Sequence, residues 1–496
     1  MKLTRREAIK LGLISSGSLL LPLAEQPPAF AQFSPQIKPF QLPFRTPPEL
    51  QPIRSDATTD YYQITMQKAK VEILPGLKTE IWGYNGITPG PTIRQFRGRQ
   101  SVVRFINKLS EEMSIHLHGM ASLPQYDGYA EDLMKPDYYK DYIYPNNRAS
   151  TLWYHDHAVG KTSRHVYMGL AGMYIVDDEV EEALPLPKGE YEIPLIIQDK
   201  RFASDGSLIF DDLNQRGLYG DVMLVNGVPF PRMEVANRKY RFRVLNAGAS
   251  RLLQLQLNKG DLIVIGTDAG LISAPVKTKT LRMGIAERYG FIIDFSQYPI
   301  GTRVILQNPI SSNNIDRNNN TNQIMCFDVV RQESDDSSIP DTLRFVQPIP
   351  VSSAVRSRTF RFDRNGGQWK INNNTWDKNR VDANPGFGDV EIWNLINPGG
   401  GWVHPVHIHL VDLQLLDRNG RTPLPYERGW KDVFLVGENE TVRVITKFGP
   451  NSGKYMMHCH NLVHEDHDMM TQFEVGKGAK SPMSAPPKPI AEMLPL

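Results

Sequence analysis

Histidine is concentrated in four short segments of this chain. Ten of its 12 histidines lie there. The segments are His116-Leu117-His118, His155-Asp156-His157, His404-Pro405-Val406-His407-Ile408-His409, and His458-Cys459-His460 followed by His464. Each segment holds a His-x-His pair, and random placement of so few histidines would give fewer than about one such pair. The clustering therefore indicates a shared chemical role.

A His-x-His pair on a β-strand presents both imidazoles on one face, because side chains alternate between the two faces. Four pairs supply eight imidazoles, a ligand that suits zinc, copper, iron and nickel. A single zinc ion takes four ligands. Eight imidazoles therefore predict a cluster of several metal ions.

Cys459 indicates a second kind of metal site. On a strand its side chain faces away from His458 and His460, so its sulfur would serve a different metal. A thiolate, two imidazoles and a weak thioether are typical of a blue-copper electron-transfer site. The candidate residues are His404, Cys459, His464 and Met469. Since two cluster histidines adjoin Cys459, the sequence predicts a short covalent path for electrons between the two sites.

Short alternating runs surround these segments and predict strands, as in 101–106, 239–244 and 441–445. An internal repeat is also visible. Asn85, Asn226 and Asn372 are each followed, 20 to 25 residues later, by a strand that ends in asparagine, at Asn107, Asn246 and Asn397. Another alternating strand follows each time, and the middle copy has glutamine where the outer two have histidine. We expect three copies of one β-domain, with the chemistry in the first and third.

Composition excludes several classes of protein. The chain has 496 residues, of which 40% are hydrophobic, and only two cysteines, so a disordered chain or a disulfide-stapled scaffold is excluded. The formal net charge is +2. Beyond residue 31 basic and acidic side chains balance, which argues against a nucleic-acid or anionic-membrane partner. Cys326 is expected to be a buried free thiol.

The N-terminal residues predict an export signal. Lys2, Arg5 and Arg6 precede an apolar run over 11–23, which is too short to span a membrane. Ala29-Phe30-Ala31 offers small residues at a cleavage point. Residues 1–31 resemble a twin-arginine signal peptide, and an ordinary secretory signal is the alternative. We expect the twin-arginine machinery to export the folded, metal-loaded protein to the periplasm or the exterior.

The four histidine segments resemble the copper motifs of the three-domain multicopper oxidases. Residues 151–157 and 239–246 are most similar to the branch of spore-coat laccase, bilirubin oxidase and phenoxazinone synthase. The resemblance implies an all-β chain of three consecutive cupredoxin-like Greek-key β-barrel domains. We place the domains at 32–188, 189–340 and 341–476, followed by a loosely held Pro-rich tail, 477–496.

The resemblance also implies which residues bind four copper ions per chain. The mononuclear type 1 copper would be bound by His404, Cys459, His464 and Met469. The type 2 copper would be bound by His116 and His407. The type 3 pair would be bound by His118, His155, His157, His409, His458 and His460.

Two carboxylates are candidates for supplying the protons that oxygen reduction consumes. Asp127 resembles an acidic residue that the family places near the type 2 copper. Glu465 directly follows His464, so alternation would turn it toward the cluster. For each, the plainer interpretation is a solvated surface charge.

The expected activity is one-electron oxidation of phenolic, aminophenolic or bilirubin-like donors, coupled to four-electron reduction of O2 to water. A cuprous or metal-ion oxidase for copper tolerance is the first alternative, although no Met- and His-rich insert is present. A copper-binding envelope protein without turnover is the second. We expect a monomer whose partners are a small-molecule or metal-ion donor and O2.

Overall fold

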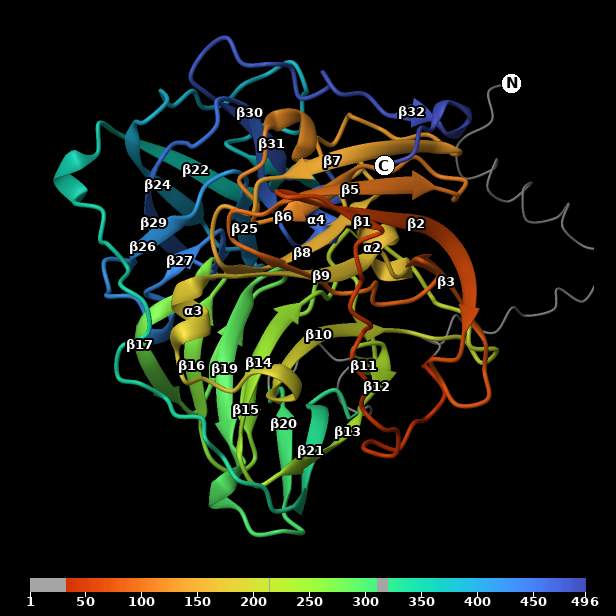
Figure 1. Cartoon of the computed structure of the whole chain (residues 1–496). Helices are drawn as coiled ribbons and strands as arrows, with labels where there is room; N and C mark the ends of the chain where they lie inside the picture. The colour runs from red at the N-terminus through yellow and green to blue at the C-terminus, as the bar shows by residue number, and fades with distance from the viewer. Residues whose placement is uncertain (1–32, 214, 310–319) are drawn as a thin grey trace, which may run out of the picture. The chain divides into compact units, whose positions relative to one another are not determined.

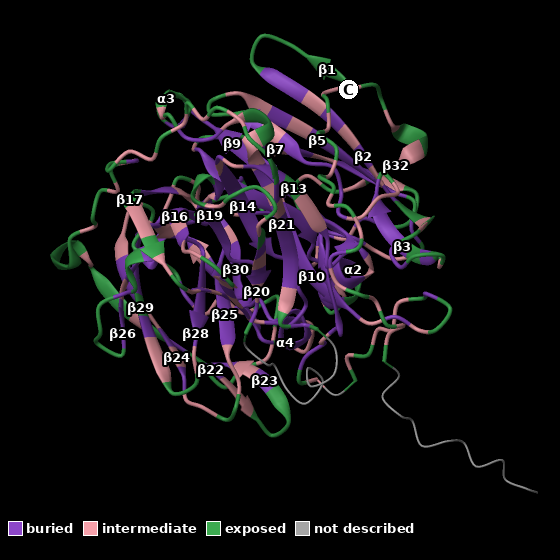
Figure 2. Cartoon of the chain, turned by 90° about the horizontal axis from the view of Figure 1, so that it is seen from below, coloured by how far each residue is buried: buried purple, intermediate pink, exposed green. Residues whose placement is uncertain are grey.

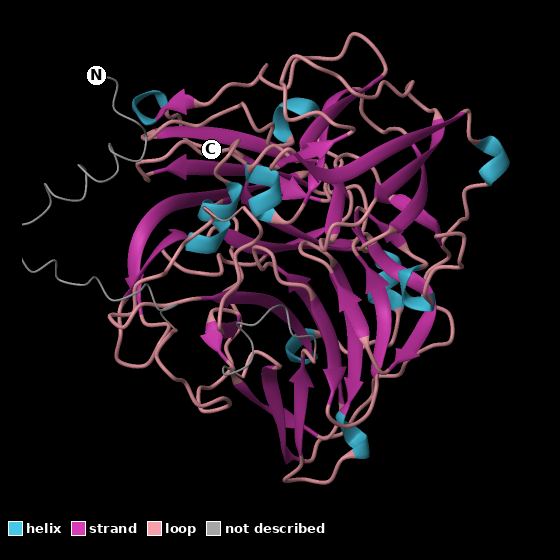
Figure 3. Ribbon diagram, turned by 180° about the vertical axis from the view of Figure 1, so that it is seen from behind, coloured by secondary structure: helices cyan, strands magenta, loops and turns pink. Residues whose placement is uncertain are grey.

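Strands dominate the part of the chain that the structure, a computed structural model, describes: residues 33–213, 215–309 and 320–496. The helices among them are short (Figure 3). The expectation of an all-β chain is confirmed. The predicted export signal, 1–31, lies outside the described residues.

Three modules follow one another along the chain, each built from two sheets (Figure 1). The first module has one sheet of β1 (Arg54–Ser55), β2 (Thr59–Val71), β3 (Thr79–Tyr84), β5 (Gln100–Asn107) and β7 (Tyr138–Tyr144), and another of β4 (Ile93–Phe96), β6 (Ile115–His118), β8 (Ser150–Asp156) and β9 (Ala171–Asp177).

The middle module has the larger sheets. One contains β10 (Glu192–Lys200), β11 (Val222–Val225), β12 (Val228–Pro229), β14 (Lys239–Asn246), β16 (Leu262–Thr267), β17 (Gly270–Thr278) and β19 (Arg288–Asp294). The other contains β13 (Arg232–Ala236), β15 (Leu253–Leu257), β18 (Leu281–Met283), β20 (Arg303–Gln307) and β21 (Gln323–Arg331).

The third module repeats the plan of the first. One sheet contains β22 (Arg356–Asn365), β23 (Gln368–Ile371), β24 (Val390–Asn397), β26 (Leu413–Arg418), β27 (Trp430–Lys431) and β29 (Glu440–Lys447). The other contains β25 (His404–Ile408), β28 (Val433–Val436), β30 (Gly453–Cys459) and β31 (Met470–Val475). Figure 2 shows that the strands are largely buried and that exposed residues gather in the loops.

The predicted repeat is visible in the backbone. Each module opens with a parallel pair of strands, β2 with β5, β10 with β14 and β22 with β24. The residue that ends the second strand is Asn107, Asn246 or Asn397. Its side-chain oxygen accepts the N–H two residues on, and its side-chain amide donates to two backbone carbonyls farther along the same module. These bonds fix how the chain leaves the strand and enters β6, β15 or β25.

The helices are α2 (Thr162–Met168), α3 (Glu179–Ala183) and α4 (Leu462–Asp466), together with the single 3-10 turns η1 (Pro124–Tyr126), η2 (Gly189–Tyr191), η3 (Phe295–Gln297), η5 (Val351–Ser353), η6 (Pro425–Glu427) and η7 (Ile490–Glu492). Within the described ranges, no helix is long and apolar enough to cross a membrane. The Asp466 carboxylate accepts the backbone N–H groups of Thr162 and Ser163 at 2.9 and 2.8 Å. This contact joins the third module to the first at the start of α2.

The C-terminal tail is more firmly held than we expected from its prolines. β32 (Lys488–Pro489) pairs antiparallel with β7 of the first module, and Figure 1 shows the two strands side by side. The Arg104 guanidinium donates to the carbonyl of Leu494. Proline at a sheet edge costs no ladder hydrogen bond on its solvent side, so this tail can serve as an edge strand.

A buried cluster of charges joins the first two modules. Arg243 on β14 is almost fully buried and donates to Asp177 at 2.8 Å and to Glu181 and Glu192 at 2.5 Å. Arg94 and Arg241 complete the cluster. Buried carboxylates need such partners, because an unpaired charge in the interior is strongly destabilising.

Replacing Arg243 by Met should therefore lower the free energy of unfolding by about 3–5 kcal/mol. Denaturant titration followed by circular dichroism measures the change. The matched control is Arg303→Met, because Arg303 pairs with Asp328 at the surface and its side chain is 45% exposed. The control should lose no more than about 1 kcal/mol. Equal losses in the two variants would contradict the role given to the cluster.

Candidate metal centre

Histidines of the first and third modules converge on one buried region. β6 pairs with β8 so that His116 lies opposite His155, and β25 pairs with β30 so that His407 lies opposite His458. Strand pairing thus places two His-x-His pairs side by side in each of the two modules, which gives one row of imidazoles per module. The two rows meet where His116 Nε2 lies 3.4 Å from His407 Nε2. Each of the ten histidines of the four segments is at most 1% exposed.

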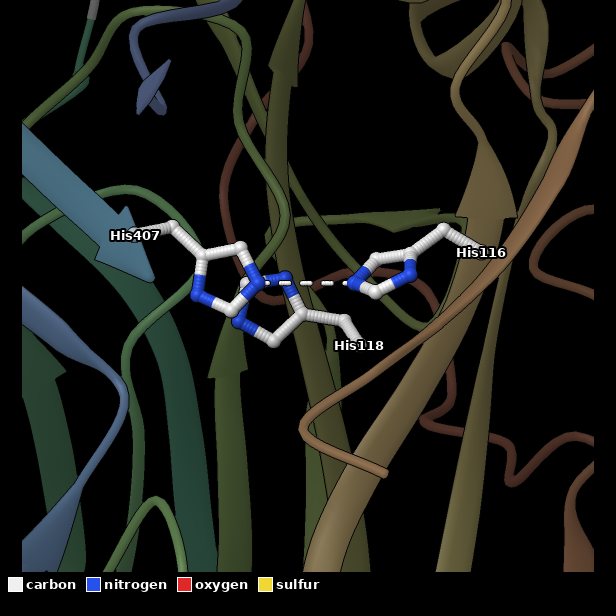
Figure 4. Close-up of side chains that lie close together, drawn as sticks. All are labelled: His116, His118 and His407. Carbon is white, nitrogen blue, oxygen red and sulfur yellow. Dashed lines mark hydrogen bonds between the residues drawn. The ribbon is translucent and has the colours of Figure 1, made fainter. Parts of the chain in front are cut away.

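Their nitrogens form compact groups. His157 Nε2 and His409 Nε2 lie 3.1 and 3.2 Å from His458 Nε2. Two further groups have ligand atoms within 4.8 Å of one another, His118 with His155 and His460, and His116 with His118 and His407. Figure 4 shows the last group, with His116 and His118 reaching His407 from a different strand. The eight imidazoles expected to bind a cluster are brought together.

The two rings of each His-x-His pair lie side by side, as alternation predicts. Their centroids are separated by 5.6, 6.0, 4.6 and 5.2 Å in the order of the chain. Three of the four pairs nevertheless divide between groups, as His458 joins His157 and His409 whereas His460 joins His118 and His155. His116 and His118 share a group with His407. A His-x-His pair therefore does not in general place both of its rings in the same group.

Hydrogen bonds leave one nitrogen free on most of these rings. His116 Nδ1 donates to the Asp127 carbonyl, His155 Nδ1 to the Asp156 carbonyl at 2.8 Å, and His407 Nδ1 to the Asp432 carbonyl at 2.9 Å. A carbonyl only accepts, so Nε2 of each ring keeps its lone pair.

Several of the remaining nitrogens are buried without any hydrogen-bond partner, namely His118 Nδ1, His155 Nε2, His157 Nδ1 and both ring nitrogens of His460. Buried polar atoms are rarely left unpaired. Converging lone pairs and unpaired buried nitrogens fit a site that binds transition-metal ions.

Burial lowers the pKa of seven of these rings and so favours their neutral form. It lowers the pKa of His155 to about 3 and that of His157 to about 4, and neighbouring imidazoles act in the same direction. The pKa of each of five others is held well below 6.5 by burial and then by adjacent imidazoles: His116, His118, His407, His409 and His460. Only a neutral imidazole can bind a metal.

The second group contains the cysteine. Cys459 Sγ lies 3.4 Å from His404 Nδ1 and 3.7 Å from His464 Nδ1, on the opposite face from the flanking histidines. Met469 is fully buried in the same apolar cluster. Its backbone carbonyl accepts the Cys459 N–H, and its own N–H donates to the His464 carbonyl, both at 3.0 Å. The four residues predicted for a mononuclear site are thus neighbours.

Burial raises the pKa of the Cys459 thiol and lowers that of His404 to about 3. A thiol in such apolar surroundings is a poor anion, and metal binding is what deprotonates a coordinating thiol. His464 Nε2 donates to the Arg216 carbonyl at 3.2 Å, so its Nδ1 faces the sulfur with a free lone pair. Trp369 stacks on His464 with ring centroids 3.7 Å apart.

Asp127 and Glu465 both lie beside the imidazole groups. Asp127 Oδ2 accepts from His409 Nδ1 at 2.8 Å. Glu465 Oε2 lies 3.0 Å from His458 Nδ1, and Oε1 lies 3.6 Å from His157 Nε2. Neither side chain is solvated, so the plainer interpretation of a surface charge does not hold. Glu465 reaches the cluster from helix α4, and the strand alternation from which we expected its direction does not apply there.

Burial raises the pKa of Asp127 well above its ordinary value. For Glu465, burial acts in the same direction, but the imidazoles of His458 and His157 outweigh it and the pKa is lowered. The two carboxylates therefore differ in charge preference although they approach the same group of rings.

Two histidines outside the segments have structural partners. His165 Nδ1 bonds the Asp156 carboxylate at 2.7 Å, and His467 Nδ1 donates to the Val463 carbonyl at 2.7 Å. Both contacts fit ordinary polar residues outside the histidine groups. Cys326 and Cys459 are both buried and free.

Sequence reasoning missed Asp432 and Arg288. Asp432 Oδ1 lies 3.0 Å from His118 Nε2 and is paired with the Arg288 guanidinium. The available signal was the charged pair Lys431-Asp432 directly before the apolar strand β28, because such charges are seldom buried without a partner.

Comparisons with known proteins agree with this geometry. Residues 65–181, 208–329 and 348–479 match three domain families, each described as multicopper oxidase. Bilirubin oxidase of Albifimbria verrucaria is 42% identical over 473 residues, covering 89% of this chain and 82% of the relative. Laccase of Bacillus subtilis strain 168 is 35% identical over 500 residues, covering 86% and 97%.

Solved structures of the same family are similar over nearly the whole chain. A laccase from Pediococcus acidilactici has a TM-score of 0.83 at 30% identity, covering 90% of this chain and 95% of that one. McoA multicopper oxidase from Aquifex aeolicus has a TM-score of 0.81 at 31% identity, covering 88% and 100%.

The expected cupredoxin-like architecture is confirmed by these neighbours. Such modules, with imidazole and thiol groups gathered between and within them, are typical of a copper-binding oxidoreductase. The chain belongs to the multicopper oxidase family.

Proposed function

We propose that this protein oxidises small organic donors one electron at a time and reduces O2 to water with four copper ions. The supporting observation is Cys459, whose sulfur belongs to one ligand group while the two residues joined to it by peptide bonds, His458 and His460, belong to the others. Four donors each lose one electron, and one O2 with four protons gives two molecules of water.

The ligand groups support the following assignment. The mononuclear type 1 copper is bound by His404, Cys459, His464 and Met469. The type 2 copper is bound by His116 and His407. The type 3 pair is bound by His118, His155 and His460 on one side and by His157, His409 and His458 on the other. Bound copper supplies one-electron redox chemistry and the affinity for O2.

The protein's own residues orient and enclose these groups. Backbone carbonyls of Asp127, Asp156 and Asp432 fix which nitrogen of their partner rings is protonated. Burial excludes water that would compete for the lone pairs. Cys459 provides the covalent connection between the two centres, and Asp127 and Glu465 place carboxyl groups beside the rings of His409 and His458, where they can pass protons to the site.

Phenols, aminophenols and bilirubin-like tetrapyrroles are the proposed donors, and the 42% identity to a bilirubin oxidase favours the last. The test is oxygen uptake by copper-loaded protein with bilirubin, a dimethoxyphenol, Cu(I) and Mn(II). We expect turnover with the organic donors at about four electrons per O2. Uptake with none of the four would overturn the proposal.

Replacing Cys459 by Ser should abolish the blue colour and reduce turnover to background, because the thiolate is the ligand that distinguishes a blue-copper site. Copper analysis should find the other three ions still bound. Cys326→Ser is the matched control, since that cysteine lies in the middle module and contacts none of the histidine groups. A blue, active Cys459→Ser protein would contradict the assignment.

Asp127→Asn and Glu465→Gln should each slow turnover by about 100-fold or more while the blue colour persists, because a positioned carboxylate contributes about 10²–10⁴-fold through proton transfer. Single-turnover experiments should place the loss in the oxygen half-reaction, with reduction of the blue copper by the donor unchanged. Normal turnover in both variants would discard the relay.

Two other functions have some support among the relatives. One solved neighbour, from Campylobacter jejuni, is described as a metallo-oxidase, at 26% identity and a TM-score of 0.79. A relative in Escherichia coli, 33% identical, is a cell division protein, FtsP. The oxygen-uptake panel separates them, because a metal-ion oxidase prefers Cu(I) and a protein without turnover consumes no oxygen.

We propose export of the folded protein through the signal at 1–31, to the periplasm or the exterior.

A further inference from the structure

Arg288 stands at the start of β19 in the middle module, which contributes no residue to the histidine groups described above. Its side chain is fully buried. Its donors reach all three modules: Nε donates to the Thr151 carbonyl of the first at 2.9 Å, Nη1 to the Ala286 carbonyl of the middle one at 3.0 Å, and both Nη atoms to the Asp432 carboxylate of the third at 2.6 and 2.5 Å. A planar guanidinium bound in this bidentate way has its orientation fixed.

Asp432, which binds Arg288, also contacts two of the cluster histidines. Its Oδ1 lies 3.0 Å from His118 Nε2, and a carboxylate paired with arginine accepts the proton there. Its backbone carbonyl accepts from His407 Nδ1 at 2.9 Å. Asp432 therefore leaves Nδ1 as the free nitrogen of His118 and Nε2 as the free nitrogen of His407. His118 Nδ1 is indeed buried without a partner.

Asp268 of the middle module holds the backbone around Asp432. Asp268 Oδ2 accepts the N–H groups of Asp432 and Val433 at 3.2 and 3.3 Å, and the Lys431 ammonium at 2.9 Å. Its Oδ1 accepts the backbone N–H of Arg288 at 2.8 Å. Both the carboxylate and the carbonyl that orient the histidines are thus anchored to the middle module.

Gly119, directly after His118, allows the Arg288–Asp432 ion pair to lie close to the backbone. A Cβ atom at this position would lie 2.8 Å from both Arg288 Nη2 and Asp432 Oδ2, and the backbone has φ +90°. A side chain here would displace the ion pair or the Leu152 side chain, whose Cδ2 would lie 2.7 Å from the same Cβ. Glycine is therefore required by the pair as well as by the turn.

We propose that Arg288 is a positioning residue, by which the middle module sets the orientation of His118 and His407 through Asp432 and so the copper affinity of the cluster. The inference rests on the proposed function, since it assumes that these rings bind copper. Partners of metal-binding histidines typically change metal affinity or activity by about 10- to 100-fold when they are replaced.

The alternative is that Arg288 only fastens the modules together. Arg243 provides the comparison, because it is also a buried arginine of the middle module and binds carboxylates of the first module, yet it contacts no histidine. A general loosening of the modules would follow from either substitution. An effect on the cluster would follow from Arg288 alone.

The experiment uses the full-length copper-loaded protein and the variants Arg288→Lys, Asp432→Asn, Gly119→Ala and Arg243→Lys. Each is dialysed against graded concentrations of a copper chelator, and the copper content, the blue absorbance and the electron paramagnetic resonance signal of type 2 copper are measured. We expect the first three variants to lose cluster copper at about 10- to 100-fold lower chelator concentration, with an altered type 2 signal and an intact blue colour. Arg243→Lys should release copper like the wild type despite a lower unfolding midpoint.

Wild-type copper retention and an unchanged type 2 signal in Arg288→Lys and Asp432→Asn would overturn the inference. Equal copper loss in Arg243→Lys, or failure of all four variants to fold, would overturn it as well, because both outcomes indicate a purely structural fastening. If Arg288→Lys alone fails to fold, Asp432→Asn and Gly119→Ala decide the question. A wild-type protein that is colourless and holds a single ion would refute the proposed function. This result is obtained before any variant is compared, so it is distinct from a failure of the inference about Arg288.

Discussion

The site depends on one constraint, that each imidazole must be dehydrated and uncharged and must keep at least one ring nitrogen free of hydrogen bonds. Water would satisfy both nitrogens, and a proton would occupy the lone pair. The structure meets the constraint with acceptors that cannot donate, chiefly main-chain carbonyls and the carboxylates of Asp127 and Asp432. The strands matter because they hold those acceptors at fixed places relative to the rings.

This requirement gives a role to the middle module, which contributes no residue to the histidine groups. The histidines come from β6, β8, β25 and β30, in the first and third modules. These strands meet in a region that the middle module covers, and there Asp268 and Arg288 hold the segment that includes Asp432. Asp268, Arg288 and Asp432 thus form one continuous polar network that includes the groups orienting His118 and His407.

The sequence predicted what depends on local alternation and missed what depends on long-range contact. The opposite facing of Cys459 and the side-by-side placement of the two rings in each His-x-His pair follow from the two-residue period of a strand. Glu465 lies near the cluster for a different reason, because the chain turns into α4 after His460. The β32 pairing and the contact of Asp432 with His118 join residues far apart in sequence, and no local pattern encodes such partners.

The order of the ligands along the chain constrains how the protein is made. The imidazole groups each combine residues before position 160 with residues after position 400. A ribosome that has released only the first two modules therefore presents half-sites, with rings that lack their counterparts. Completion of these groups is consequently a late event in biosynthesis, because it must wait until the third module has been made and folded.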